Sequence, residues 1–168
     1  ELPMSLKYTK GDKPEMTVRG PEKLVQALQW ENGRLWREGK GIHFGKGLVV
    51  TITAPQFPDL VVAGASEAEL AGLDQPSLSI DAAGALDLTG KGKVATLKID
   101  TKGASDVDLS EVEARDATID IAGAGDVDIA ATGKVDATIS GAGDITLHRK
   151  PEVLTSRING AGSINHSY

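Results

Sequence analysis

One dipeptide recurs at nearly constant intervals along most of this chain. Gly-Ala begins at residues 64, 84, 103, 123, 141 and 160, so the spacings are 20, 19, 20, 18 and 19 residues. The clearest copies read IAGAGDVDI (121–129) and ISGAGDITL (139–147). A fixed period of this length indicates a repeat architecture, in which each unit packs mainly against its neighbours.

The residues within each copy alternate between apolar and polar side chains. Around Gly123, residues of one parity are apolar, namely Ile119, Ile121, Val127 and Ile129, whereas Asp120, Asp126 and Asp128 take the other parity. A period of two is typical of β-strands. Gly123 and Gly125 fall on the apolar parity, and a pair of glycines there predicts a sharp corner between two strands.

Each repeat therefore reads as strand, corner, strand and polar turn, with turns expected at 89–93, 110–115, 130–134 and 148–152. Such a unit buries its apolar face only by stacking on the next one. We predict an all-β, right-handed parallel β-helix of about 19-residue coils. An antiparallel sandwich does not require the same corner in every unit, and a leucine-rich repeat needs Leu and Asn at positions where this chain lacks them.

Residues 1–58 lack the repeat. Strands are expected at 6–9, 16–19, 48–53 and 60–63, and residues 30–36 predict a hairpin because Asn32-Gly33 suits a type I′ turn. We expect one domain over 1–168, in which residues 1–58 cap the solenoid formed by 59–168. The polar tail after Ile164 is expected to cap the last coil, which argues against end-to-end assembly.

The charge balance limits the possible partners. The net charge is −6, and residues 51–168 carry nine Lys and Arg against eighteen Asp and Glu. An acidic body does not favour nucleic acid as a partner. The chain has no Cys, no apolar run long enough to span a membrane, and no signal-peptide pattern in residues 1–30.

Acidic residues recur three positions after each repeat glycine, at Glu67, Asp87, Asp106, Asp126 and Asp144, with Ser163 in the last copy. In a parallel stack these carboxylates lie ~4.8 Å apart and repel one another. They could bind divalent cations, with Asp106, Asp126 and Asp144 as the ligands, or they could accept backbone hydrogen bonds near the corner. We favour the second interpretation and predict no metal site.

Two further features have both structural and functional interpretations. The repeated alanines (Ala65, Ala85, Ala104, Ala124, Ala142 and Ala161) predict a smooth stripe, which either docks a partner or simply fits a tight bend. Trp30 and Trp36 are predicted to share one face of the hairpin as a cross-strand pair. They could contact a sugar ligand, although burial in the cap is the simpler interpretation.

No motif of a catalytic or cofactor site is present, and the three His residues are far apart in sequence. We therefore predict no catalytic residues, no cofactor and no enzymatic activity. A polysaccharide-active β-helix enzyme would need a cleft on long loops, whereas the turns here are short. A self-assembling structural protein is the other alternative.

The copies GAGDVDI, GAGDITL and GAGSIN, preceded by TITAP and LVVAGA, resemble the bacterial family described as putative auto-transporter adhesin, head GIN domain. The resemblance covers roughly residues 5–166. It implies a right-handed β-helix exported to the periplasm or cell surface, with an adhesin-like binding or scaffolding role. The expected partner is a surface glycan or a protein, and homo-oligomerisation stays open.

Overall fold

The computed structural model describes residues 4–26, 28–31, 34–37 and 48–168. Most of them lie in strands, and the one helix in this part of the chain is the short α1 (Glu22–Gln26). The N-terminal strands are β1 (Met4–Lys10), β2 (Glu15–Arg19), β3 (Leu28–Glu31), β4 (Arg34–Arg37), β5 (Leu48–Ala54) and β6 (Leu60–Val62). The repeats form β7 (Ala65–Ala82), β8 (Ala85–Thr101), β9 (Ala104–Ile121), β10 (Val127–Ala131), β11 (Lys134–Ile139), β12 (Asp144–Leu147), β13 (Val153–Ile158) and β14 (Ser163–His166).

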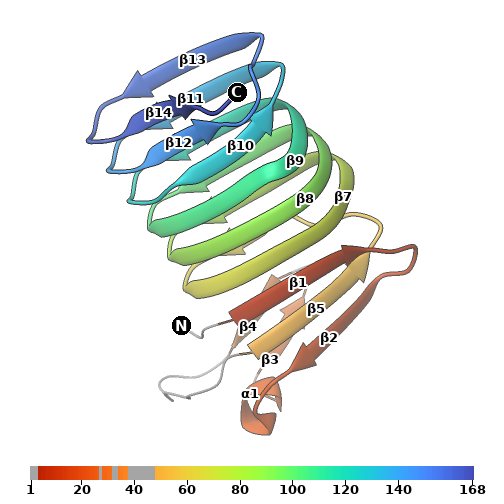
Figure 1. The fold of residues 1–168 in the computed structure, drawn as a ribbon. Coiled ribbons are helices and arrows are strands. Elements are labelled where there is room, and N and C mark those ends of the chain that lie inside the picture. Colours follow the sequence, from red (N-terminus) through yellow and green to blue (C-terminus); the bar gives the residue numbers. More distant parts are fainter. Residues whose placement is uncertain (1–3, 27, 32–33, 38–47) are drawn as a thin grey trace.

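Successive repeats stack in parallel and in phase with the Gly-Ala spacing. Ala65 pairs with Ala85, and Ala85 pairs with Ala104. In Figure 1 the strands at the front run one way and return at the back while the chain climbs from its N-terminal to its C-terminal end. This turn is right-handed, so the structure confirms the predicted parallel β-helix, with about five turns.

The core consists of columns of aliphatic side chains that run through the coils. One column contains Leu78, Leu97, Ala117 and Val135, all fully buried and joined by the strand register. The corner glycines stack in the same way. A Cβ atom on Gly103 would overlap the carbonyl oxygen of Gly84, and one on Gly123 would overlap that of Gly103. The glycines at the predicted corners therefore let the backbones of successive coils approach closely.

In the first repeats, the structure has bent, continuous strand where polar turns were predicted. β7, β8 and β9 each continue from one corner to the next, through the segments 89–93 and 110–115 where turns were expected. The strands bend there by a shift of register, between Leu70 and Leu73 in β7 and between Thr89 and Lys91 in β8. A bulge turns the chain without ending the hydrogen bonding, so no loop is needed.

The first strand of the chain is inserted into the solenoid. β1 lies between β5 and β7 and is parallel to both (Figure 1). β2 pairs antiparallel with the other side of β5. β5 therefore lies between β1 and β2, although these two strands are consecutive in the chain and only residues 11–14 connect them. Met16 and Val18 of β2 pack against the core. Strands were predicted at these places, but this order within the sheet was not.

The predicted hairpin exists as β3 and β4, although its turn residues, Asn32 and Gly33, lie outside the described residues. Trp30 pairs with Leu35, and Trp36 pairs with Gln29. The two tryptophans are therefore not a cross-strand pair, and residues 30 and 36 have opposite parity in the hairpin. The prediction of a shared face was wrong because a two-residue loop places residue 35, not 36, opposite residue 30.

In the last described coil, the residues of β13 are exposed. Leu154 and Ile158 of β13 continue core columns of the preceding strand, since they pair with Val135 and Ile139. However, their exposed fractions are 37% and 44%. The expectation that the polar tail caps this coil was wrong, because Asn165 and His166 extend β14 along β12 instead of folding across the end.

Candidate functional site

An open groove of about 790 Å³ runs along the solenoid beside the glycine corners. One wall is the alanine column, formed by Ala65, Ala85, Ala104 and Ala124. The other is the acidic column, formed by Glu67, Asp87, Asp106 and Asp126. The residues between the columns, such as Leu86 and Gly125, line the floor, and Ser5 and Val49 extend the lining onto β1 and β5. The groove thus crosses several coils.

The acidic column partly hydrogen-bonds to the coil above it. Asp126 accepts the backbone N–H of Asp144 at 3.2 Å, and Asp144 accepts that of Ser163 at 2.7 Å. For this column we favoured hydrogen bonds from backbone N–H groups over cation binding, and this interpretation is correct for Asp126 and Asp144. However, these hydrogen bonds join successive coils and do not close a local turn. Within the described ranges, no hydrogen bond or ion pair reaches Asp87 or Asp106.

Asp106 has the least favourable environment in the acidic column. Partial burial raises the pKa of its carboxyl group, and the negative charges of Asp87 and Asp126 on either side raise the pKa further. These residues are stacked neighbours, as the sequence predicted. Asp106 is therefore protonated more readily than an isolated aspartate, and the protonated carboxyl group can donate a hydrogen bond.

Metal binding receives no geometric support from the acidic column. Among residues 4–26, 28–31, 34–37 and 48–168 there is no group of three or more His, Asp or Glu side chains placed to hold a metal ion. Asp106, Asp126 and Asp144 follow one another along the axis rather than converging on a point. A straight column of this kind is poorly suited to surrounding a cation with oxygen ligands.

The second set of acidic residues, two positions further on, has local ion-pair or hydrogen-bond partners. Lys7 forms an ion pair with Glu69 at 3.1 Å, and His148 Nε2 lies 2.6 Å from Asp128 Oδ1. The Ser110 hydroxyl and backbone N–H donate to Asp108, which lowers the pKa of that carboxyl group. In the described part of the chain, the carboxylates of the two columns that lack such partners are thus those of Asp87 and Asp106, whereas Glu67 accepts a hydrogen bond from the Ser5 hydroxyl at 3.1 Å.

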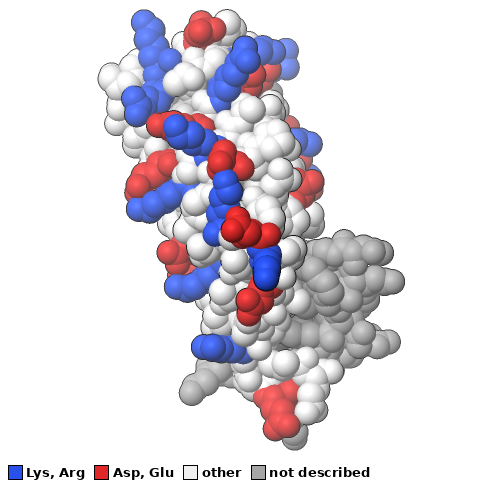
Figure 2. Space-filling model, turned by 90° about the vertical axis from the view of Figure 1, so that its right-hand side faces the viewer, with Lys and Arg blue, Asp and Glu red and all other residues white. Residues whose placement is uncertain are grey.

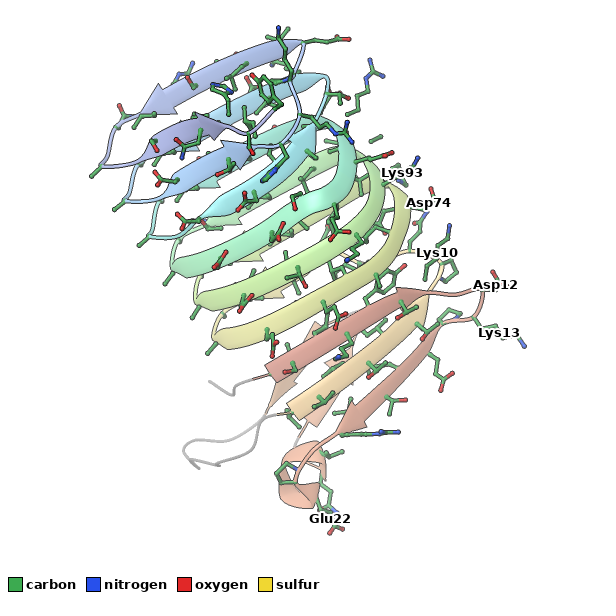
Figure 3. All side chains as sticks on the ribbon, viewed as in Figure 1. Lys10, Asp12, Lys13, Glu22, Asp74 and Lys93 are labelled. Carbon is green, nitrogen blue, oxygen red and sulfur yellow. The ribbon has the colours of Figure 1, made fainter. Side chains whose placement is uncertain are left out.

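The edge at the right of Figure 1 carries a ladder of alternating charges, which we call the charge ladder. Lys10 pairs with Asp74 at 2.6 Å, and Lys93 pairs with Glu113 at 2.9 Å. Figure 3 shows Lys10, Asp74 and Lys93 one above the other on this edge, and Figure 2 shows the alternation of sign along it. Opposite charges are neighbours throughout, so this edge offers no surface of one sign to a charged partner.

The model of the family described as putative auto-transporter adhesin, head GIN domain, matches residues 1–151. The chain belongs to this family. No curated protein matches the sequence. The described residues include no helix long and apolar enough to cross a membrane.

Two solved structures share the fold of this head GIN domain. A putative adhesin from Bacteroides fragilis NCTC 9343 is 18% identical, with a TM-score of 0.67 over 98% of this chain and 91% of that chain. A putative lipid binding protein from Parabacteroides distasonis ATCC 8503 is 20% identical, with a TM-score of 0.51 over the same shares. At this level of identity the likeness concerns the fold alone.

The groove itself was missed from the sequence, although both of its walls were recognised. The alanines and the acidic residues are two positions apart in every copy, so both columns follow the same corner at a constant separation. That spacing was the available signal. Trp30 and Trp36, the other predicted contacts, belong to β3 and β4, and their side chains lie outside what the structure describes.

Proposed function

We propose that this head GIN domain is a non-enzymatic binding module of the bacterial cell envelope or surface, and that it holds an extended ligand in the groove. The groove supports this proposal because it is open, is continuous over several coils, and lies outside the core. A chain-like ligand, such as a glycan, can contact the same two side-chain columns repeatedly. Each contact is weak, but several on one chain add up.

The walls also indicate which chemistry the ligand has. Methyl groups on one side favour apolar faces, such as those of sugar rings or acyl chains. Carboxylates on the other side accept hydrogen bonds from hydroxyl or amino groups and repel anions. We therefore expect a neutral or amino-bearing glycan, rather than a polyuronate or a phosphate-bearing lipid.

A thermal-shift screen against oligosaccharides tests this proposal, because a ligand of the folded state raises the melting temperature as its concentration rises. The panel contains neutral, amino-bearing and uronate glycans, divalent cations and, because of the name of one structural neighbour, fatty acids. We expect a saturable shift with a neutral or amino-bearing glycan. Release of reducing ends from any glycan would instead indicate an enzyme.

Two groove variants and one control locate the binding. Ala104→Trp fills the groove, and Asp106→Asn removes the negative charge and replaces one acceptor oxygen by an amide donor. Both should weaken binding at least about tenfold, which corresponds to one lost contact of about 1.4 kcal/mol. Asp120→Asn, at an exposed carboxylate near the other end of β9 and outside the groove lining, should leave binding unchanged. Equal affinity in all three variants would contradict the assignment to the groove.

A further inference from the structure

β1 occupies a place that the repeat spacing assigns to β5. Val50 of β5 and Ala68 of β7 both pair with Leu6 of β1, and they are 18 residues apart. On the other side of the coil, Leu60 of β6 pairs directly with Ile80, which is 20 residues further along the chain. Both separations lie within the spacing of 18 to 20 residues between successive repeats. β5 and β6 therefore have the length of a regular coil, but β1 separates β5 from β7.

β1, β5 and β7 carry the same alternation of inward and outward side chains. Leu6 of β1 lies inward and is buried, as are its partners in β5 and β7. The outward Thr9 lies between Thr53 and Ala71 in the same way. If β1 leaves, β5 can move by one strand spacing, ~4.8 Å, and pair with β7 without changing which side chains face the core.

Three polar side chains of β1 contact carboxylates of β7, namely Ser5 with Glu67, Lys7 with Glu69 and Lys10 with Asp74. Both ion pairs are exposed, so each stabilises only weakly and is screened by salt. At the levels of Ser5 and Lys7, β5 has Val49 and Thr51, which carry no charge. Charge therefore favours β1 over β5 as the neighbour of β7.

We propose that β1 is an exchangeable strand, and that the protein has a second, less populated state in which β1 is released and β5 pairs directly with β7. Release costs the burial of Leu6 and Tyr8 and the hydrogen bonds of one strand interface, so the inserted state predominates. In the second state β5 regains on β7 the pairing that it loses with β1. The edge of β7 is therefore covered in both states.

Release of β1 also changes one end of the groove. Met4 and Ser5 belong to the groove lining, together with Val49. In the second state Val49 takes the place of Ser5 beside Glu67, so the Glu67 carboxylate loses its hydroxyl donor and gains an apolar neighbour. This change is the same whatever ligand the groove binds.

Disulfide trapping detects the second state, because the chain contains no native Cys. In the full chain, Thr53→Cys and Ala71→Cys together place two thiols on either side of Thr9, two strand spacings or ~9.6 Å apart, which a disulfide cannot bridge. In the second state these residues are direct neighbours at ~4.8 Å, which a disulfide can bridge. We expect slow cross-linking within one chain on mild oxidation.

The matched pair Glu15→Cys and Ala71→Cys is one strand further apart in both states, because Glu15 of β2 pairs with Thr53. It should not cross-link. Absence of cross-linking for the pair at Thr53, or equal rates for the two pairs, would overturn the proposal.

Removal of one ion pair tests whether charge holds β1 in place. With the cysteines at positions 53 and 71, Lys7→Ala should raise the cross-linking rate by up to about fivefold, as expected for the loss of one exposed ion pair. Lys13→Ala removes the same charge from the segment after β1 and should leave the rate unchanged. The difference between the two variants should shrink in high salt. A slower rate with Lys7→Ala would contradict the proposal.

Hydrogen exchange of the unmodified chain provides the second readout. We expect the amides of β1 to exchange faster than those of both β5 and β7, because these two strands protect each other when β1 is released. A common rate for all three strands would show that this part of the chain opens as a unit, without strand exchange. Exchange of β1 as slow as that of β8 and β9 would likewise exclude the second state.

Discussion

The corner glycines are the residues that tolerate change least. Their carbonyl groups lie where the Cβ atom of the next coil's glycine would be, so the obstacle is backbone and not a side chain that can rotate away. Gly84, Gly103, Gly123, Gly141 and Gly160 all share this environment. One substitution therefore disturbs two coils, the one that carries it and the one below.

We expect Gly103→Ala to lower the free energy of unfolding by about 3 kcal/mol, at the upper end of the usual cost of overpacking. Urea denaturation measures the change. The control is Ala104→Gly, which alters the adjacent exposed residue by the same methyl group and should cost at most about 1 kcal/mol. Similar losses in the two variants would show that the stacked backbone does not impose the constraint.

The positions of single residues could be predicted from the sequence where the same pattern recurs in every repeat. The glycine corners and the stack of acidic residues were predictable, because each copy supports the interpretation of the others. Trp30 and Trp36 occur once, and their relation depended on the exact loop length of one hairpin. The outward Ala104 and Asp106 were also predictable individually, but the width of the groove between their columns depends on how the corner bends.

At the level of the strands, β1 is the least regular feature of the fold. It occupies the place next to β7 that chain order would assign to β5, and Tyr8 holds it there. The buried Tyr8 ring packs against Phe57 with ring centres 4.9 Å apart, and its hydroxyl donates to the carbonyl oxygen of Ala54 at 3.0 Å. An alternating strand pattern identifies a strand but not its neighbours, so this insertion was not predictable.

Tyr8 gives the fold a dependence on alkaline pH. Burial raises the pKa of its phenol above the ordinary value of 10.0, although nearby Lys10 acts in the opposite direction. A group whose pKa is raised on folding stabilises the protein fully below its unfolded pKa, and this contribution is lost as the pH rises through the folded pKa. We therefore expect the unfolding free energy to fall above about pH 10.

The variant Tyr8→Phe separates this effect from the titration of other groups. At neutral pH it should be less stable by about 1 kcal/mol, because the hydrogen bond to Ala54 is lost. Above about pH 10 the difference between the two proteins should narrow or reverse. Parallel stability curves across the alkaline range, from urea titrations at each pH, would show that the Tyr8 phenol does not contribute.

On the scale of the whole molecule, the two edges of the solenoid have different charge patterns. The corner edge carries a column of like charges beside the groove, whereas the opposite edge carries the charge ladder (Figure 2). Lys93 lies between Asp74 and Glu113, and its pKa is raised chiefly by the hydrogen bond to Glu113. Each exposed pair stabilises only weakly, but reversing one charge places three like charges in a row.

We expect Lys93→Glu to lower the urea midpoint measurably at low salt and by much less at high salt, where exposed charges are screened. Adding Glu113→Lys to this variant should restore part of the stability, because an opposite pair forms again. Asp120→Asn, on an exposed face away from the ladder, serves as the reference. A loss that is independent of salt, or no recovery in the double variant, would contradict a role for the alternation.

The insertion of β1 also orders events in time. As synthesis proceeds from the N-terminus, β1 emerges before both of its neighbours, which arrive only with residues 48–54 and 66–71. Each later coil finds its neighbour about 19 residues away, and contacts between nearby segments form sooner than contacts between distant ones. The middle of the chain therefore becomes the template, and β1, although made before both of its neighbours, is among the last strands to reach its place.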